Sequence, residues 1–175
     1  CILTVHKFRL WFHHHFKKSS YTLWCSFFIT GEIWYYTSMK IISWNVNGIR
    51  AHVKKGAFDW ILNESPDIFC LQETKAHRDQ LTEAVLSPQG YTSYFDHSKM
   101  KKGYSGVAVY TKNVPEKVEY GFGIDELDQE GRQIALFFKG KNTKWVLINT
   151  YFPNGGGGEE RIAFKLRYYD AFLAY

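Results

Sequence analysis

The sequence predicts an α/β fold in one unit with mixed or antiparallel sheet content, and three observations support this prediction. A strand, an amphipathic helix and a second strand follow one another with short connections between residues 40 and 71, which is typical of a βαβ unit. From residue 91 the pattern changes to segments that alternate or run apolar, which indicates strands. No internal repeat and no Pro- or Ser-rich linker divides the 175 residues, a length that suits one compact domain.

Residues 1–38 differ in composition from the rest of the chain. They are crowded with Trp, Phe, Tyr and His, contain four Lys/Arg and one acid, and show neither helical nor strand periodicity. They match neither a signal peptide nor a membrane span. We expect Met39 to be the natural start and residues 1–38 to be a non-native or disordered leader, read in frame from upstream DNA. The intact mass of the natural protein tests this expectation.

Charge and cysteine content narrow the class of protein. The formal net charge is +5, and the first 38 residues account for +3 of it, which leaves +2 for residues 39–175. A mildly basic body is compatible with a polyanionic partner. The three cysteines have neither zinc-ligand spacing nor an even count for disulfides, so we expect a reducing, cytosolic compartment.

The first elements after Met39 are predicted from apolar spacing and turn residues. Lys40–Val46 is a strand candidate that ends at the turn signal Asn47-Gly48. Gly56–Glu64 has apolar residues at helical spacing and ends before a proline. Residues 68–71 form a short apolar strand buried on both faces. Arg78–Val85 is predicted as a second helix.

The second part of the chain is predicted to be strands followed by one long helix. The strands are Tyr91–Asp96, Ser105–Thr111, Lys117–Tyr120, Arg132–Phe138 and Lys144–Phe152. Glu159–Tyr175 follows as a helix, and the residues predicted to share one apolar face are Ile162, Leu166, Tyr169 and Phe172/Leu173. The helix is still in progress at Tyr175, with no Gly or Pro stop signal. We therefore expect the domain to be incomplete.

The candidate chemistry lies at the ends of the first two predicted strands. The apolar run IFCL is followed by Glu73 and Lys75, and the preceding strand ends in Asn45 and Asn47. A charge does not fit inside a buried strand, so Glu73 is placed where the strand ends and the crevice beyond the sheet begins. Carboxylate and amide oxygens suit Mg²⁺ or Mn²⁺ rather than zinc. Arg50, Lys75 and the loop of residues 99–102 add the cations that a phosphodiester requires.

A third predicted strand ends in the sequence NTYFPN, residues 149–154. The phenol of Tyr151 and the amide of Asn154 can donate hydrogen bonds to a phosphate oxygen. Simpler interpretations remain for each motif: Trp44 and Tyr151 as core residues, and Asn47-Gly48 as an ordinary turn. Their occurrence together on successive strand ends favours a functional site.

Four motifs, SWNVNGIR, LQETK, GYSGVAVYTK and NTYFPN, occur in this order and resemble the exodeoxyribonuclease III family of abasic-site endonucleases, in the endonuclease/exonuclease/phosphatase superfamily. The resemblance extends over Met39–Tyr175. It implies a four-layer α/β sandwich. It also implies cleavage of double-stranded DNA 5′ to an abasic site, in a reaction that depends on Mg²⁺ and for which Mn²⁺ can substitute. Activities at 3′ ends, exonuclease and phosphatase, often accompany it. We expect the full-length protein to be a monomer that does not bind a membrane. Its expected location is the cytoplasm in bacteria and the nucleus or mitochondria in eukaryotes.

The resemblance also implies roles for individual residues. It assigns metal binding to Glu73 and places Asn45 in the metal and active-site cluster. Asn47 is a further metal-binding candidate, at a position where some members have Asp. Tyr151 matches the active-site tyrosine that contacts the scissile phosphate. The positions matched to the DNA-binding surface are Arg50, Lys75, Gly103, Tyr104 and Asn154.

Two family motifs, Asp-x-Asn and a closing Ser-Asp-His, do not occur in residues 1–175. We therefore expect this chain to be the N-terminal half of the nuclease, with the sandwich truncated after its first half, and to be inactive alone. Two alternatives stay open. One is another phosphodiesterase of the superfamily: a retroelement endonuclease, a DNase, or a lipid or inositol phosphatase. The other is a non-catalytic half-domain that associates through uncovered edges.

Overall fold

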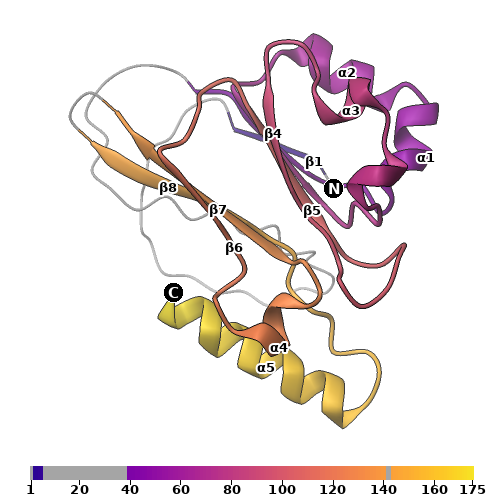
Figure 1. Cartoon of the computed structure of the whole chain (residues 1–175), viewed down its shortest axis with the longest axis vertical. Coiled ribbons are helices and arrows are strands. Elements are labelled where there is room, and N and C mark those ends of the chain that lie inside the picture. Colours follow the sequence, from indigo (N-terminus) through magenta and orange to yellow (C-terminus); the bar gives the residue numbers. More distant parts are fainter. Residues whose placement is uncertain (1, 6–38, 141–142) are drawn as a thin grey trace, which may run out of the picture.

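The computed structural model describes residues 2–5, 39–140 and 143–175, and these form two packed β-sheets with helices on the outer faces. Figure 1 shows helices α1, α2 and α3 over the first sheet, and helix α5 beyond the second sheet. The order of layers is therefore helices, sheet, sheet, helix. This arrangement confirms the predicted α/β sandwich.

The first sheet has the strand order β1-β2-β3-β5-β4. Strand β2 (Ile41–Asn45) runs parallel to β3 (Ile68–Gln72), and the crossover between them carries α1 (Ile49–Lys54) and α2 (Ala57–Glu64). Antiparallel pairings then add β5 (Val107–Thr111) and β4 (Thr92–Asp96). Because β2 and β3 are parallel, their carboxyl ends meet at one edge, as the predicted βαβ unit requires.

The second sheet is an antiparallel meander of β6 (Lys117–Tyr120), β7 (Gln133–Lys139) and β8 (Lys144–Thr150). A short helix, α4 (Asp125–Asp128), precedes β7. Helix α5 (Glu159–Ala174) follows β8 and contacts its end, where the hydroxyls of Thr150 and Tyr168 are 2.8 Å apart. The predicted strands and the long helix are thus confirmed within a few residues.

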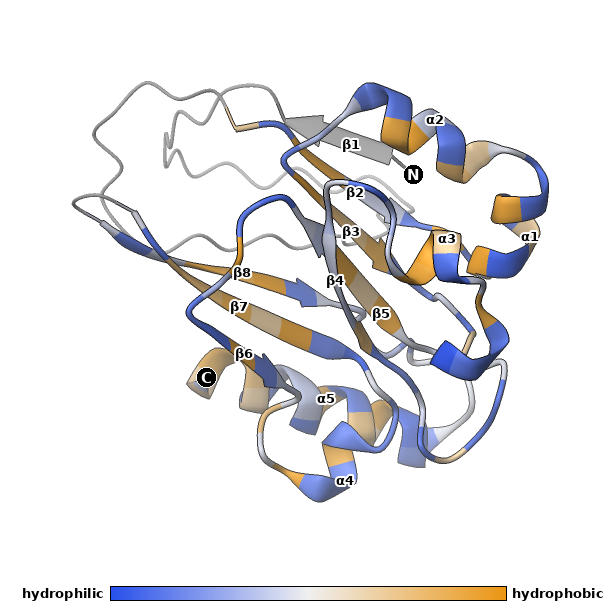
Figure 2. Ribbon diagram, turned by 45° about the horizontal axis from the view of Figure 1, so that its top comes forward, coloured by the Kyte–Doolittle hydropathy of each residue, from blue (hydrophilic) through white to orange (hydrophobic). Residues whose placement is uncertain are grey.

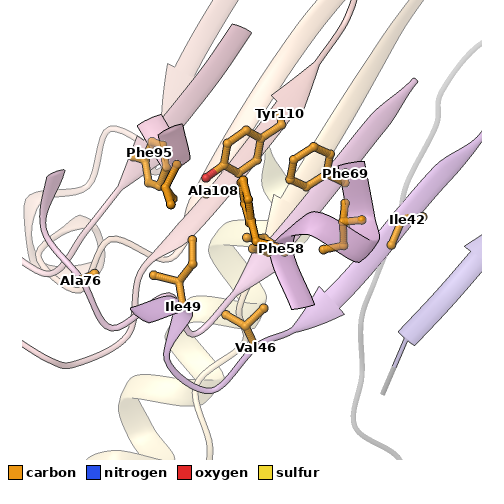
Figure 3. Close-up of a cluster of buried hydrophobic side chains, with 12 residues drawn as sticks. Ile42, Val46, Ile49, Phe58, Phe69, Ala76, Phe95, Ala108 and Tyr110 are labelled. Carbon is orange, nitrogen blue, oxygen red and sulfur yellow. The ribbon is translucent and has the colours of Figure 1, made fainter. Parts of the chain in front are cut away.

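Period-two alternation divides the first sheet between two apolar layers. Ile42, Phe69 and Tyr110 point toward helices α1–α3, and Figure 3 shows the ring of Tyr110 beside Phe69, onto which it stacks with centroids 4.1 Å apart. Their neighbours Ile41 and Ile68 point the other way. They pack between the two sheets with side chains of β7 and β8, namely Ile134, Leu136, Phe138 and Leu147. Apolar (orange) segments therefore run along the strands of both sheets in Figure 2.

Several elements differ from the sequence prediction. Arg78–Val85 is not one helix: a 3-10 turn (Arg78–Gln80) and α3 (Glu83–Leu86) are separated because Leu81 and Thr82 have extended backbone angles. Helices α1 and α4 were not predicted, since each is too short to show a 3.6-residue period. Strand β1 (Ile2–Val5) pairs antiparallel with β2. The remainder of the predicted leader lies outside the described residues.

The apolar face predicted for α5 is not buried as a whole. Ile162, Leu166 and Leu173 are exposed, whereas Tyr168 is buried against Phe122 and Phe152. The helix carries apolar side chains at two sets of positions with helical spacing, and periodicity alone does not choose between them. Within the described ranges, no helix combines the length and apolar character needed to cross a membrane.

Candidate active site

The predicted catalytic loop follows β3 in an unusual backbone conformation. Glu73 and Lys75 have φ values of 54° and 50°, and Asn47 and Ser105, which lie beside them, have φ values of 43° and 50°. A left-handed conformation costs a non-glycine residue about 1 kcal/mol or more. Four such residues at one place indicate a loop whose shape is imposed by its surroundings.

Backbone hydrogen bonds on both sides impose that shape. The amide N–H of Gly48 donates to the carbonyl oxygen of Glu73 at 2.7 Å, and the amide N–H of Lys75 donates to that of Ser105 at 2.8 Å. Gly106 is required beside them, because a Cβ there would lie 2.4 Å from Oγ1 of Thr74. The turn after β2 and the turn before β5 therefore hold Glu73 between them.

The carboxylate of Glu73 is the centre of the site. Oε1 accepts a hydrogen bond of 2.7 Å from Nδ2 of Asn45, and Oε2 lies 3.1 Å from Nζ of Lys75. The hydroxyl of Tyr151 also lies close enough to this carboxylate to lower its pKa. Asn45 comes from β2, Glu73 from the end of β3 and Tyr151 from the segment after β8. Both sheets therefore contribute to one cluster, as the strand-end motifs predicted.

These contacts set the protonation states of two groups. Burial raises the pKa of Glu73, but the hydrogen bonds from Asn45, Lys75 and Tyr151 and the charge of Lys75 outweigh it, so the pKa lies below 4.5. Burial and the negative charge of Glu73 raise the pKa of Tyr151 to about 12. At neutral pH the site therefore holds a carboxylate and a protonated phenol.

The donor set fits a hard divalent cation. The ammonium of Lys75 contacts Oδ1 of Asn47 as well as Oε2 of Glu73, so one cation already reaches both oxygens. A carboxylate with an amide oxygen is the type of ligand set that Mg²⁺ accepts while keeping waters in its other positions. Among the described residues, no three His, Cys, Asp or Glu side chains gather around a common point. Any cation here therefore depends on amide oxygens beside the single carboxylate.

Two buried amides join the sheets directly behind Glu73. Nε2 of Gln72 donates to Oδ1 of Asn149 at 2.7 Å and to Oγ of Ser43 at 3.1 Å. Nδ2 of Asn149 donates to the carbonyl oxygens of Leu71 at 3.1 Å and Ala108 at 2.9 Å. Because Gln72 precedes Glu73 and Asn149 lies two residues before Tyr151, this contact fixes the spacing of the two functional strand ends.

A second polar cluster, which the sequence analysis did not identify, lies beside Tyr151. The carboxylate of Glu130 accepts hydrogen bonds from Arg132 and Arg161, and the hydroxyl of Tyr104 joins the same group. The guanidinium of Arg132 lies 4.5 Å from the centre of the Tyr151 ring. The only local signal was a Glu-Gly-Arg turn at the start of a strand; Arg161, 31 residues from Glu130, gave none.

The remaining predicted residues lie at different depths. Nη2 of Arg50 donates to the carbonyl oxygen of Lys75 at 3.5 Å, which places Arg50 on the rim of the Glu73 cluster. Gly103 and Asn154 are exposed, and the hydroxyl of Tyr104 is turned inward to the Glu130 cluster. The structure therefore brings together Asn45, Asn47, Glu73, Lys75 and Tyr151, and leaves the DNA-binding roles of the others as predictions.

Comparisons with known proteins agree with this architecture. The model of the Endonuclease/Exonuclease/phosphatase family matches residues 42–174. An exodeoxyribonuclease of Bacillus subtilis is 44% identical over 138 residues, which cover 78% of this chain and 52% of that protein. A DNA-(apurinic or apyrimidinic site) endonuclease of Dictyostelium discoideum is 37% identical over 139 residues, covering 78% of this chain and 37% of its own length.

A solved structure of a related fold also superposes on this chain. The 3′ phosphatase NExo from Neisseria, in a complex with a product DNA hairpin, superposes with a TM-score of 0.66 at 28% identity, covering 79% of this chain and 51% of that one. The chain thus spans about half the length of the Bacillus relative and of this structure. The matched region includes the Glu73 cluster, the second sheet, the first sheet apart from β1 and Ile41, and the whole of α5. The chain belongs to the Endonuclease/Exonuclease/phosphatase family.

Proposed function

We propose that the Glu73 cluster is the metal-binding part of a DNA-repair nuclease that hydrolyses the DNA phosphodiester bond 5′ to an abasic site. The observation that carries this proposal is the Glu73 carboxylate held jointly by Asn45, Lys75 and Tyr151 at the junction of the two sheets. The names of the Bacillus and Dictyostelium relatives support DNA as the substrate. Because the match covers only 52% of the Bacillus relative and 37% of the Dictyostelium relative, we expect the 175-residue chain alone to be inactive.

The chain's own residues have defined tasks in this proposal. Glu73 and Asn47 would hold Mg²⁺, or Mn²⁺ as a substitute, and Asn45 orients the Glu73 carboxylate through its 2.7 Å hydrogen bond. The bound cation would neutralise charge on the scissile phosphate. Tyr151 remains protonated because its pKa is about 12. Its single O–H would rotate from Glu73 to donate a hydrogen bond to a phosphate oxygen when the substrate binds.

Cations on the surface supply the attraction to the DNA backbone. Arg50 lies on the rim of the Glu73 cluster, and Lys99, Lys101 and Lys102 are exposed on the loop before Tyr104. Neutralising phosphates with such side chains makes affinity depend strongly on salt. We propose that Asn154 and Gly103, also exposed, lie on the same DNA-facing surface.

Activity at 3′ ends is a second candidate, which the likeness to the 3′ phosphatase NExo favours. The same cluster of carboxylate, amides and phenol suits hydrolysis of a terminal phosphate monoester. A duplex that carries a recessed 3′-phosphate distinguishes this activity from incision at an abasic site. Release of inorganic phosphate reports the first activity and strand cleavage reports the second.

The test is incision of a duplex oligonucleotide with one abasic site. The 175-residue chain is assayed alone and mixed with the C-terminal half of the Bacillus relative, with Mg²⁺ and with chelator. We expect no cutting by the chain alone, and Mg²⁺-dependent cutting by the mixture that the substitution Glu73→Ala abolishes. The matched control is the Bacillus enzyme divided at the same place. If the two Bacillus halves cut together and the mixture does not, the proposal is wrong.

A further inference from the structure

The Glu130 carboxylate is the anchor of the second polar cluster. Glu130 is 6% exposed, and Oε2 accepts a hydrogen bond of 2.5 Å from Nε of Arg132, which is 2% exposed. Nη1 and Nη2 of Arg161 donate to Oε1 and Oε2 at 2.7 Å and 2.8 Å, a bidentate contact. One carboxylate therefore serves two guanidinium groups. Such charge-assisted hydrogen bonds are strong and directional.

Arg132 in turn holds Tyr151 by three contacts. Nη1 donates to the carbonyl oxygen of Tyr151 at 2.9 Å, and the amide N–H of Tyr151 donates to the carbonyl oxygen of Arg132 at 2.8 Å. The guanidinium also lies 4.5 Å from the centre of the phenol ring. Arg132 therefore fixes both the backbone and the ring of the residue whose hydroxyl reaches Glu73.

The cluster also joins segments that are distant in the sequence. Arg161 belongs to helix α5, and its Nη2 donates to the hydroxyl of Tyr104 at 3.0 Å. The hydroxyl of Tyr104 accepts another hydrogen bond of 3.0 Å from Nη2 of Arg132 and contacts Glu130 at 3.3 Å. Glu130 thus ties α5 and the loop that carries Tyr104 to Arg132, the residue immediately before β7.

Removal of the carboxylate would leave two guanidinium groups facing each other without an anion. An unpaired charge in the interior is strongly unfavourable, and Arg132 is more deeply buried than Arg161. Arg132 would therefore have to rotate toward water, and rotation would end its contacts with the ring and carbonyl of Tyr151. The effect of Glu130 on the Glu73 cluster is thus transmitted through Arg132.

We propose that Glu130 is a positioning residue, which holds Arg132 over Tyr151 and thereby fixes the phenol toward Glu73. Glu130 itself touches neither the substrate nor the Glu73 cluster. The inference deepens the proposed function and rests on it for its consequence in catalysis. The geometric part concerns the side-chain conformation of Tyr151 and can be tested without any activity.

The first test measures the χ1 rotamer of Tyr151 by NMR, from the three-bond couplings of Cγ to the backbone nitrogen and carbonyl carbon. We expect one staggered rotamer in the unsubstituted 175-residue chain and rotamer-averaged couplings in Glu130→Gln. The matched control is Glu126→Gln, which removes an exposed carboxylate of α4 that pairs with Arg167 of α5. Tyr168, a buried residue of α5, serves as an internal reference and should keep a single rotamer.

Unchanged couplings of Tyr151 in Glu130→Gln would overturn the proposal, and so would averaging at Tyr168 to the same extent, because that result indicates general loosening. If Glu130→Gln does not fold, Arg132→Lys carries the test. That substitution keeps a buried cation for Glu130 but removes the planar group over the ring. Averaged couplings of Tyr151 support the proposal, and a single rotamer contradicts it.

The second test measures affinity for a duplex that contains a stable abasic-site analogue. Loss of a hydrogen bond to a charged group typically weakens binding about tenfold, so Tyr151→Phe and Glu130→Gln should each lower affinity by about that factor. The double variant should lose no more than either single one. If Tyr151→Phe has no effect, the proposed function is wrong while the rotamer result stands. If only Glu130→Gln has no effect, the positioning role is wrong.

Discussion

The side-chain amide of Gln72 donates a buried hydrogen bond of 2.7 Å to Oδ1 of Asn149, and this contact connects the two sheets immediately behind the Glu73 cluster. Asn149 is 2% exposed and uses its Nδ2 group for two backbone carbonyls of the first sheet. A polar side chain between two apolar sheet faces gives their packing a defined register, because sliding would leave several polar atoms unpaired.

The substitution Asn149→Ala should therefore destabilise the fold. It leaves the amide of Gln72 and the carbonyl oxygens of Leu71 and Ala108 with fewer partners, and unsatisfied buried groups cost about 1–3 kcal/mol each. We expect a loss of about 3 kcal/mol in the free energy of unfolding, measured by urea denaturation. Asn63→Ala on the exposed side of α2 is the control and should change it little. Equal effects at the two positions would contradict this interpretation.

The stability of the fold should depend on the protonation of Asp96. Burial raises the pKa of Asp96 from 3.8 to about 6, although the charge of Lys99 opposes the shift. Because the pKa of Asp96 is raised in the folded state, the protonated Asp96 contributes to the free energy of unfolding below pH 3.8. This contribution is lost as the pH rises through about 6. Asp96→Asn should stabilise the fold at pH 8 by on the order of 2 kcal/mol and have little effect near pH 3.5. Denaturant unfolding at several pH values measures this difference, and a pH-independent effect would refute the assignment.

Binding of divalent cations should require the carboxylate of Glu73. We expect Glu73→Gln to abolish binding of Mn²⁺ measured by water proton relaxation, because the remaining ligands are neutral amides. Asn45→Ala removes only the hydrogen bond that orients the carboxylate and should weaken binding about tenfold. Glu64→Gln, at a carboxylate that pairs with Lys40 at 2.5 Å, is the control. A similar loss in that control would show that binding is not specific to the Glu73 cluster.

Gly131 should tolerate no side chain. Its φ is +59°, and a Cβ would lie 2.2 Å from the carbonyl carbon of His97. Backbone strain and a clash with main-chain atoms together should lower the free energy of unfolding by about 3 kcal/mol or more in Gly131→Ala. Gly156→Ala is the control, since that glycine has nothing within 4 Å of an added Cβ. Thermal unfolding of both variants, followed by circular dichroism, distinguishes the two positions.

The sequence predicts the fold well where local patterns reflect the pleat of a sheet. Alternation places Ile41 and Ile42 on opposite faces of β2, and Ser65-Pro66 ends α2 where predicted. It also places Asn45 and Glu73 at neighbouring strand ends, because parallel strands align their carboxyl ends. These are consequences of chain geometry over short separations.

The Glu130 cluster is different, because no local pattern marks a buried charge that is paired across 31 residues. The left-handed conformations of Glu73 and Lys75 are equally hidden, since neither residue type favours them. The exposed and buried faces of α5 were not separable either, because Leu166 and Tyr168 both belong to apolar sets at helical spacing. In each case the deciding information lies in tertiary contacts.

The joint origin of the site in two sheets has a consequence for the order of events during folding. Gln72 and Asn149 are 77 residues apart in the sequence, and closing so long a loop is a slow step relative to formation of the local βαβ unit. A chain with only its first sheet formed has Glu73, Asn45 and Lys75 in place but lacks the phenol of Tyr151. In the proposed function, the contact of Tyr151 with a phosphate therefore forms only when the two sheets dock. We expect a nascent or partly opened chain to lack this contact with nucleic acid.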